Sequence, residues 1–250
     1  MYVIDKLPNL SSLFHTFSTI DDGNMSFKFD DEAEVKRNRK LFLDKLEISP
    51  SDCVAPYLEH TNSVLVVGDK QRGNGILDWR TSPHVDALVT QERDCYLFML
   101  VADCLPIILF DEATNSLGLV HAGWKGVELQ IVTKTINKMQ VHFGVKSETI
   151  VAAIGPCIRP QTYRFEDVVQ KMPDRFEVWK PYLYDNDDGT TSIDLVSFVK
   201  AQLSDSGVKT IIDCGVNTGT DKRFFSHYRD SRIDAGDRGR FACVVGLRSS

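Results

Sequence analysis

The chain of 250 residues carries 29 Lys and Arg against 35 Asp and Glu, which gives a formal net charge of −6. This mild acidity argues against a general binder of nucleic acids or anionic membranes, because such proteins usually carry a basic excess. Hydrophobic residues make up 42% of the chain, enough for a substantial core, so we expect an ordered protein. No apolar run approaches the roughly 20 residues that span a bilayer. Residues 1–20 lack the pattern of a secretory signal, so we expect a cytoplasmic protein.

The six cysteines are scattered, and no Cys-x-x-Cys pair occurs, which excludes a zinc ribbon and a thioredoxin-type redox motif. We expect most of them to be small buried residues. The chain shows no internal repeat, low-complexity tract or linker, so we expect one domain over residues 1–250. The loosest stretch, Asp185–Thr191, is rich in Asn, Asp and Gly and is expected to be an exposed loop.

The first half of the chain predicts one helix followed by several strands. The helix is expected over Asp31–Leu46, with Asp30 or Asp31 as its N-cap. Its apolar side is expected at Val35, Leu41, Phe42 and Leu46. Apolar runs predict a short buried strand over Val64–Val67, and further strands over Asp86–Thr90, Tyr96–Ala102, Ile107–Phe110 and Leu117–Val120. The third and fourth runs are apolar enough for strands buried on both faces, and Pro106 is expected to break the strand pattern between them.

The second half predicts further helices among strands. Helices are expected over Val127–Phe143, ended by Gly144, then near Glu166, and over Asp194–Ser204. Apolar runs predict further strands over Ile150–Ile154, Thr210–Cys214 and Phe241–Leu247. Many strands follow one another without a helix. The pattern therefore favours a single α/β (mixed α+β) domain, with mixed buried sheets flanked by helices, over a regular doubly wound sheet.

Two histidines and one cysteine stand where predicted strands end. His121 closes an apolar strand and opens a glycine turn into a helix, a typical place for a site on an α/β scaffold. Cys104 is expected on a neighbouring strand, and His60 stands just before the strand at Val64. Two imidazoles and one thiolate would leave a tetrahedral Zn²⁺ one open position, and zinc lowers the pKa of water there to near ~7. The spacing matches no short metal motif, and a core cysteine with hydrogen-bonded histidines fits it equally.

Other segments offer weaker signals. The turn Gly123–Gly126 could present backbone N–H groups to an anion, with Lys125 adding charge, or it could be an ordinary strand-to-helix turn. The chain has no Walker A, GxGxxG or GxSxG motif, so nucleotide-binding and α/β-hydrolase folds have no motif support. Arg37 and Arg39 are expected on the solvent-exposed face of the first helix. The basic and aromatic C-terminal stretch, 223–230 with 238–240, fits a polar pocket or a surface loop.

Several sequence blocks together resemble one family. They are Asp86-Ala-Leu-Val-Thr90, Val101-Ala-Asp-Cys-Leu-Pro106, His121-Ala-Gly-Trp-Lys-Gly126, Ile154-Gly-Pro-Cys-Ile158, Phe224-Phe-Ser226, Arg229-Asp230 and Gly239-Arg240. The chain resembles the YfiH-like purine nucleoside phosphorylase family, first named for multicopper polyphenol oxidase or laccase. The resemblance implies a single mixed α/β domain related in architecture to a toxin-type cysteine deamidase. It also implies a zinc ion held by His60, Cys104 and His121 as the catalytic centre.

The resemblance further implies phosphorolysis of purine nucleosides such as adenosine, inosine and guanosine to the free base and ribose 1-phosphate. The partners would be the nucleoside and phosphate. It also implies deamination of adenosine to inosine and, in some members, cleavage of methylthioadenosine. Candidates to bind the substrate anion are Arg39, Lys125 and Arg229. Three family positions differ: Leu58 replaces Gln, Lys125 replaces Arg and loses its fork geometry, and Tyr228 replaces Arg.

Deamination requires water to attack C6 of adenine and ammonia to leave after a proton transfer. Asp103 adjoins Cys104, but consecutive strand residues point to opposite faces, so Asp103 is a weak candidate for the proton shuttle. One alternative is a metal-free cysteine hydrolase, with Cys104 as nucleophile and His121 as base. Another is a non-catalytic nucleoside-binding protein without turnover. A copper oxidase is disfavoured, because the chain has six His and no His-x-His pair.

Overall fold

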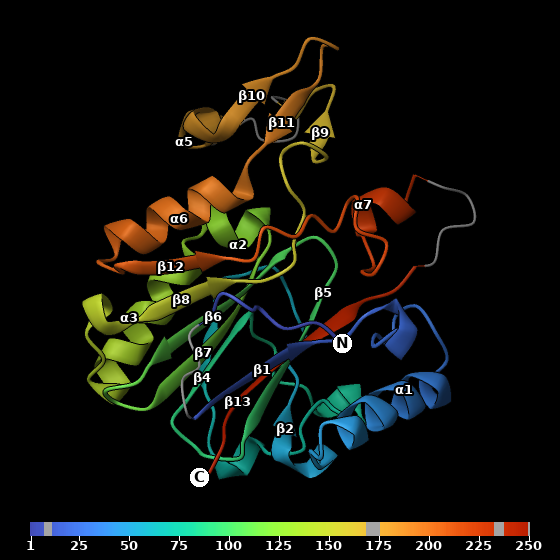
Figure 1. Ribbon diagram of the computed structural model, residues 1–250, viewed down its shortest axis with the longest axis vertical. Helices are drawn as coiled ribbons and strands as arrows, with labels where there is room; N and C mark the ends of the chain where they lie inside the picture. The colour runs from blue at the N-terminus through green and yellow to red at the C-terminus, as the bar shows by residue number, and fades with distance from the viewer. Residues whose placement is uncertain (8–11, 169–175, 233–237, 250) are drawn as a thin grey trace.

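The computed structural model describes residues 1–7, 12–168, 176–232 and 238–249, and their strands form three sheets (Figure 1). The six-stranded sheet has the order β12-β8-β6-β7-β4-β3. Its strands are β3 (Val64–Val66), β4 (Ala87–Thr90), β6 (Leu105–Asp111), β7 (Ser116–Ala122), β8 (Val151–Ile154) and β12 (Thr210–Asp213). The four-stranded sheet has the order β1-β13-β5-β2. Its strands are β1 (Leu13–Phe17), β2 (Cys53–Val54), β5 (Tyr96–Val101) and β13 (Phe241–Leu247).

A small three-stranded sheet stands at the top of Figure 1 and has the order β10-β11-β9. Its strands are β9 (Arg164–Phe165), β10 (Leu183–Asp185) and β11 (Thr191–Ile193). The described helices are α1 (Glu32–Lys45), α2 (Trp124–Glu128), α3 (Ile131–Phe143), α5 (Phe176–Trp179), α6 (Leu195–Asp205) and α7 (His227–Asp230).

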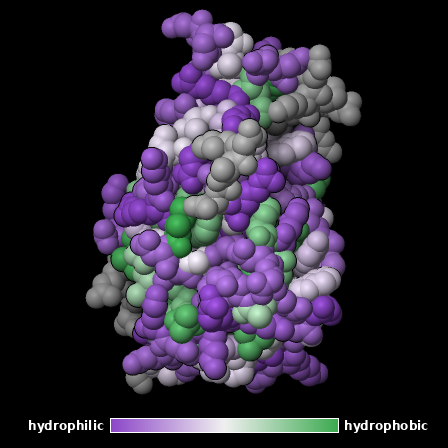
Figure 2. Space-filling view, turned by 90° about the vertical axis from the view of Figure 1, so that its right-hand side faces the viewer, coloured by the Kyte–Doolittle hydropathy of each residue, from purple (hydrophilic) through white to green (hydrophobic). Residues whose placement is uncertain are grey.

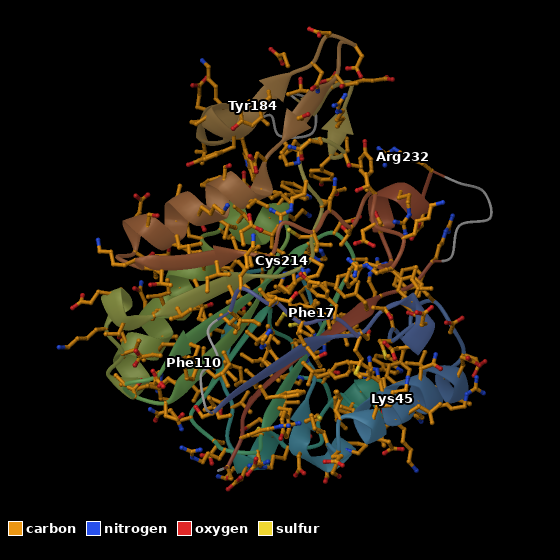
Figure 3. All side chains as sticks on the ribbon, in the orientation of Figure 1. Phe17, Lys45, Phe110, Tyr184, Cys214 and Arg232 are labelled. Carbon is orange, nitrogen blue, oxygen red and sulfur yellow. The ribbon has the colours of Figure 1, made fainter. Side chains whose placement is uncertain are left out.

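Apolar packing arranges these elements in layers. Side chains of β6 and β7, such as Ile108 and Leu119, pack against side chains of β5 and β13, so the two large sheets face each other. The opposite face of the six-stranded sheet packs against α3 and α6, and the opposite face of the four-stranded sheet packs against α1. In Figure 1, α1 and the pair α3 and α6 lie on opposite sides of the sheets. Phe17 and Phe110, labelled in Figure 3, are buried between the sheets.

The predicted fold class is confirmed: the chain forms a mixed α/β domain with consecutive strands in mixed sheets. The strands expected to be buried on both faces, β5 and β6, are almost fully buried. The first helix begins after its predicted N-cap, because the Asp31 side chain accepts a hydrogen bond from the backbone of Glu34. The predicted loop 185–191 contains the turn between the short antiparallel strands β10 and β11.

Four local predictions were wrong. Pro106 lies inside β6, opposite His121, at the start of the strand where a missing N–H costs least. The helix predicted over Val127–Phe143 is two helices, because Gln130 adopts a left-handed backbone with φ 59° between them. Leu41 is exposed, and β3 is half-buried because it is the edge strand of its sheet.

Other elements lie outside the predictions or outside the described chain. The short strands β1, β2, β9, β10 and β11 were not predicted. The helix expected near Glu166 falls largely on 169–175, outside the described residues. All six cysteines are free thiols. Among the described helices, none is both long and apolar enough to cross a membrane. The face in Figure 2 is mainly hydrophilic, with hydrophobic side chains in small separate patches.

Candidate metal centre

One edge of the six-stranded sheet gathers the predicted site residues because neighbouring strands run in opposite directions. Strands β4 and β6 begin at this edge, and β7, antiparallel to both, ends there. Cys104 directly precedes β6, His121 is the second-last residue of β7, and Asp86 directly precedes β4. His60 lies in the turn before β3, which runs parallel to β4. Segments up to 61 residues apart in sequence therefore meet at one point of the fold, from His60 to His121.

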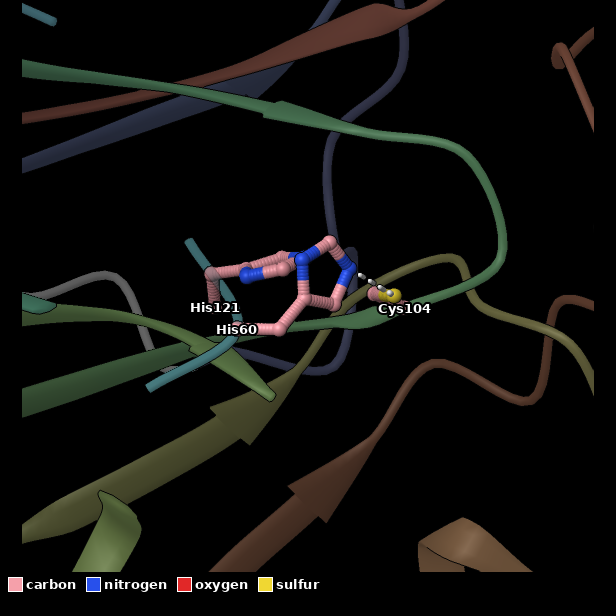
Figure 4. Close-up of side chains that lie close together, drawn as sticks. All are labelled: His60, Cys104 and His121. Carbon is pink, nitrogen blue, oxygen red and sulfur yellow. Dashed lines mark hydrogen bonds between the residues drawn. The ribbon is translucent and has the colours of Figure 1, made fainter. Parts of the chain in front are cut away.

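His60, Cys104 and His121 form the one group of metal-binding side chains that the described residues contain. Their ligand atoms all lie within 4.8 Å of one another, and Cys104 Sγ is 4.0 Å from His60 Nε2 (Figure 4). The two imidazole rings are 4.9 Å apart and nearly perpendicular. Zn–S bonds of about 2.3 Å and Zn–N bonds of about 2.0 Å at tetrahedral angles place S and N about 3.5 Å apart. The three donors therefore fit one ion with little movement.

Asp86 holds this group together, and its role was not predicted. Its carboxylate is fully buried and accepts a hydrogen bond from His121 Nδ1 at 2.9 Å, which leaves the other ring nitrogen of His121 free for a metal. The same carboxylate accepts from the backbone N–H groups of His60 at 3.0 Å and Thr61 at 2.7 Å, and from the Thr61 hydroxyl. One side chain thus fixes the His121 ring and the turn that carries His60. The only sequence signal was its place in a family block.

The turn at His60 needs this support because its backbone is left-handed, with φ 59°. Such a conformation is uncommon for a residue with a side chain, and hydrogen bonds from the surrounding structure must hold it. The His60 side chain is exposed, whereas His121 is only 3% exposed. The group is therefore buried at the strands and open to solvent at the turn.

The charges of the group stabilise one another. Burial alone would raise the pKa of Asp86, but hydrogen bonds from His121 and Thr61 outweigh burial and lower that pKa to about 2. Burial also opposes ionisation of Cys104, yet His121 and then His60 outweigh it and lower the pKa of the thiol. Against burial, Cys104 and Asp86 raise the pKa of His121. The site therefore favours a thiolate, which is the form of cysteine that binds metals.

Gly123 provides the space in which two of these side chains meet. A Cβ atom at this position would lie 2.9 Å from Cys104 Sγ and 3.0 Å from His60 Cδ2. Real Cβ atoms essentially never approach other atoms this closely, so any larger residue would displace one of the two side chains. The sequence showed a glycine turn here but not this reason for it.

Arg39, Lys125 and Arg229, which the sequence suggested as ligands of the substrate anion, have different surroundings in the structure. Arg39 is only 2% exposed, and its guanidinium donates to the backbone carbonyls of Met25, Gly75 and Ile76, at 2.8 Å each. It therefore joins helix α1 to two loops. Lys125 is exposed, with its ammonium 5.4 Å from the centre of the Trp124 ring.

All three nitrogens of the Arg229 guanidinium donate hydrogen bonds to the protein. Nε donates to Asp230 at 2.8 Å, Nη1 donates to the Thr218 carbonyl at 2.9 Å, and Nη2 donates to the Phe224 carbonyl at 2.8 Å. Arg229 thus organises the C-terminal loops. Arg39 and Arg229 are both held by protein acceptors, so they are poorly placed to bind a substrate anion.

Asp103 anchors the segment before Cys104. Its side chain accepts from the Thr218 hydroxyl at 2.7 Å and from the backbone N–H of Tyr228 at 2.6 Å. Its backbone is left-handed, with φ 86°, so the alternation of strand side chains does not apply to it. Because both carboxylate oxygens accept hydrogen bonds, the structure gives Asp103 a positioning role between Cys104 and helix α7.

The family model for the multi-copper polyphenol oxidoreductase laccase matches residues 15–248 of this chain. A purine nucleoside phosphorylase from Deinococcus radiodurans is 31% identical over 97% of this chain and 92% of its own length. Another from Corynebacterium glutamicum is 32% identical over 87% of this chain and 83% of its own. The crystal structure of YlmD from Geobacillus stearothermophilus superimposes with a TM-score of 0.87 at 27% identity, covering 97% of this chain and 94% of that one.

Proposed function

The chain belongs to the multi-copper polyphenol oxidoreductase laccase family, and from that premise we propose that it is a zinc-dependent purine nucleoside phosphorylase. Support comes from relatives that carry the name purine nucleoside phosphorylase over nearly the whole chain. The donor set of one thiolate and two imidazoles suits zinc. A multicopper oxidase needs several copper sites, whereas the described residues offer one group of possible ligands.

The proposal depends most on the arrangement of His60, Cys104 and His121. Three protein donors on one ion are typical of catalytic zinc, because structural zinc is almost always held by four. The exposed side of the group at His60 is where a substrate would reach it. When bound, zinc would supply a Lewis acid and lower the pKa of a bound water.

Phosphorolysis exchanges one bond at C1′ of the ribose. An oxygen of hydrogen phosphate forms a bond to C1′, while the bond from C1′ to N9 of the purine breaks and its electron pair stays on the purine. The proton of hydrogen phosphate ends on the purine, so the products are the free base and ribose 1-phosphate. The protein must therefore bind an anion beside the sugar and hold the nucleoside in line for attack.

We also propose that the same site deaminates adenosine. That reaction takes up water, releases ammonia and yields inosine, and it uses no phosphate. Methylthioadenosine is a further candidate substrate, because it differs from adenosine only at C5′ and has the same purine and the same C1′–N9 bond.

The test is to purify the protein, measure bound metals by mass spectrometry, and incubate it with adenosine, inosine or guanosine, with and without phosphate. We expect about one zinc per chain, and free base with ribose 1-phosphate when phosphate is present. Adenosine without phosphate should yield inosine. Removal of the metal should abolish both reactions, and added zinc should restore them. A metal-loaded protein that turns over no purine nucleoside would contradict the proposal.

A metal-free cysteine hydrolase is the second candidate, and one observation favours it. Asp86, His121 and Cys104 follow one another as orienting carboxylate, base and nucleophile, with 2.9 Å between Asp86 and His121 Nδ1. This candidate predicts a protein that purifies without stoichiometric metal, is insensitive to chelators and is inactivated by thiol alkylation. The zinc enzyme instead predicts loss of activity with chelator and its recovery with zinc.

A further inference from the structure

A small pocket beside helix α7 is lined by Arg238, Arg240 and His227, which have no ion-pair partner among the described residues. It has a volume of about 120 Å³, enough for several water molecules and therefore for a small oxyanion. The residues that matter here are Phe29, Ser226, His227, Asp230, Arg238 and Arg240. Nothing in the sequence distinguished this pocket from a surface loop.

Arg240 is the central cation of the pocket. Its guanidinium lies 4.4 Å from the centre of the Phe29 ring, and Nη1 donates to the neighbouring Gly239 carbonyl at 2.7 Å. Among the described residues, no carboxylate lies within ion-pair distance of it and no other group accepts a hydrogen bond from its side chain. Arg240 is half-buried, so its charge is partly shielded from bulk water. Its planar guanidinium still has N–H groups that donate to no described residue.

The rest of the lining adds the charge of Arg238 and two neutral donors. Burial and then the positive charge of Arg240 lower the pKa of His227, against the opposing charge of Asp103, so His227 is favoured as a neutral hydrogen-bond donor. The Ser226 hydroxyl accepts a hydrogen bond from the backbone of Arg229, so its own proton is available to donate.

Among the described residues of the lining, the one carboxylate is already paired. Asp230 accepts from Arg229 Nε at 2.8 Å and from the backbone N–H of Ser226 at 2.9 Å. The unpaired charges of the described lining, Arg238 and Arg240, are therefore positive, which favours an anion.

The pocket adjoins the metal centre. The N–H of Tyr228, in helix α7, donates to Asp103, the residue next to Cys104. Burial lowers the pKa of Arg240, while the nearby negative charges of Cys104 and Asp103 oppose that shift. An anion bound at Arg240 would therefore lie beside the metal-binding group, on the side of helix α7.

We propose that this pocket binds the inorganic phosphate that attacks the nucleoside, with Arg240 as its main ligand and His227, Arg238 and Ser226 as supporting donors. This assignment rests on the proposed phosphorylase function. It replaces Arg39, which is buried and donates to three backbone carbonyls, and Arg229, whose three guanidinium nitrogens all donate to protein acceptors.

The test titrates inorganic phosphate into zinc-loaded protein by calorimetry and measures the phosphate dependence of phosphorolysis. Arg240→Gln should weaken phosphate binding and raise the KM for phosphate by about 10- to 100-fold, the loss of a charge-assisted hydrogen bond. Its zinc content and its phosphate-independent turnover of adenosine should stay within about twofold of wild type. Arg240→Lys, which keeps the charge but not the fork, should recover part of the loss.

Two further variants keep the test decisive. Arg238→Gln alters an exposed side chain of the pocket and should raise the KM for phosphate about threefold, even if Arg240→Gln fails to fold. Arg37→Gln removes an exposed arginine on helix α1 and should change nothing. Unchanged phosphate binding in every pocket variant would overturn the assignment. A second result would also overturn it. If the pocket variants bound inorganic phosphate normally and lost only their inhibition by added adenosine 5′-monophosphate, the pocket would bind the phosphate group of a nucleotide.

The two proposals fail in different ways. If wild type binds phosphate, Arg240→Gln does not, and no nucleoside is cleaved, the pocket is an anion site but the phosphorylase proposal is wrong. If phosphorolysis proceeds with the same KM for phosphate in wild type and in both Arg240 variants, the enzyme is a phosphorylase and the assigned pocket is wrong.

Discussion

The metal centre and the cationic pocket beside helix α7 are neighbours that use their polar groups in opposite ways. In the metal centre, Asp86 holds both His121 and the turn of His60, so the ligands are oriented before a metal arrives. In the pocket, Arg240 and His227 carry no carboxylate partner among the described residues. The hydrogen bonds of Asp86 therefore fix the geometry of the metal centre, whereas the donors of Arg240 and His227 remain available to bind a ligand.

The same distinction sorts the other cations. Arg39 and Arg229 resemble the metal centre, because protein acceptors occupy their donors. They stabilise loops around the site and are poor candidates to bind substrate.

Removing a metal ligand should have the largest effect. Cys104→Ala and His121→Ala should each abolish turnover of adenosine, with and without phosphate, because the two remaining donors cannot hold zinc in place. Metal content and turnover are measured together, and circular dichroism reports the fold. A folded Cys104→Ala variant with full activity would show that this group is not the catalytic centre. Cys243→Ala, which alters a buried cysteine of β13, is the matched control and should keep its zinc.

Arg39→Met should lower stability and leave phosphate binding unchanged. The substitution removes three hydrogen bonds to buried loops, at about 1 kcal/mol each, so the free energy of unfolding should fall by roughly 3 kcal/mol. Urea denaturation measures the change. Arg37→Met, on the exposed side of the same helix, should change the free energy of unfolding by less than about 0.5 kcal/mol.

The opposite result would restore the prediction made from the sequence. If Arg39→Met unfolded at the same urea concentration as wild type but raised the KM for phosphate, Arg39 would be a substrate ligand. The contrast between occupied and free cations would then be lost.

Asp86→Asn should weaken zinc binding by about 10- to 100-fold, the usual cost of losing a group that orients a metal ligand. Asparagine has one acceptor oxygen where the carboxylate has two, so its amide nitrogen would face either the N–H groups of His60 and the His121 ring or the N–H and hydroxyl of Thr61. Competition with a zinc chelator measures the affinity. Asp69→Asn, at an exposed carboxylate, is the control, and equal affinities in the two variants would refute the orienting role.

The candidate metal-binding residues could be predicted from the sequence, but their support could not. His60, Cys104 and His121 stand beside apolar strands, and the chemistry of their side chains made them candidates for the group that the structure brings together. Asp86 and Gly123 act through contacts that arise only when β3, β4, β6 and β7 pair in register, and no local pattern encodes that pairing. Arg39 shows the converse error: a charged residue on an amphipathic helix predicts exposure, yet its partners are carbonyls of distant loops.

The main layers of the fold could also be predicted, because their long strands are marked by their apolar composition. Strands such as β5, β6 and β13 are long and almost fully buried, so their composition alone marks them. The short strands β9, β10 and β11 contain two or three residues each, too few for periodicity to register. The break at Gln130 depends on one left-handed residue inside a helical pattern, which sequence periodicity cannot detect.

Gly123→Ala should have the smallest effect on the metal centre, about a five- to tenfold loss of zinc affinity without loss of stability. The backbone at Gly123 is ordinary, with φ −79°, so the added methyl group acts only through its contacts with Cys104 and His60. The exposed His60 ring can turn aside, which keeps the strain small. Gly126→Ala in the same turn is the matched control, because its Cβ would meet its nearest atoms at 3.4 Å. Equal zinc affinity in the two variants would show that the centre tolerates crowding and is less rigid than its hydrogen bonds suggest.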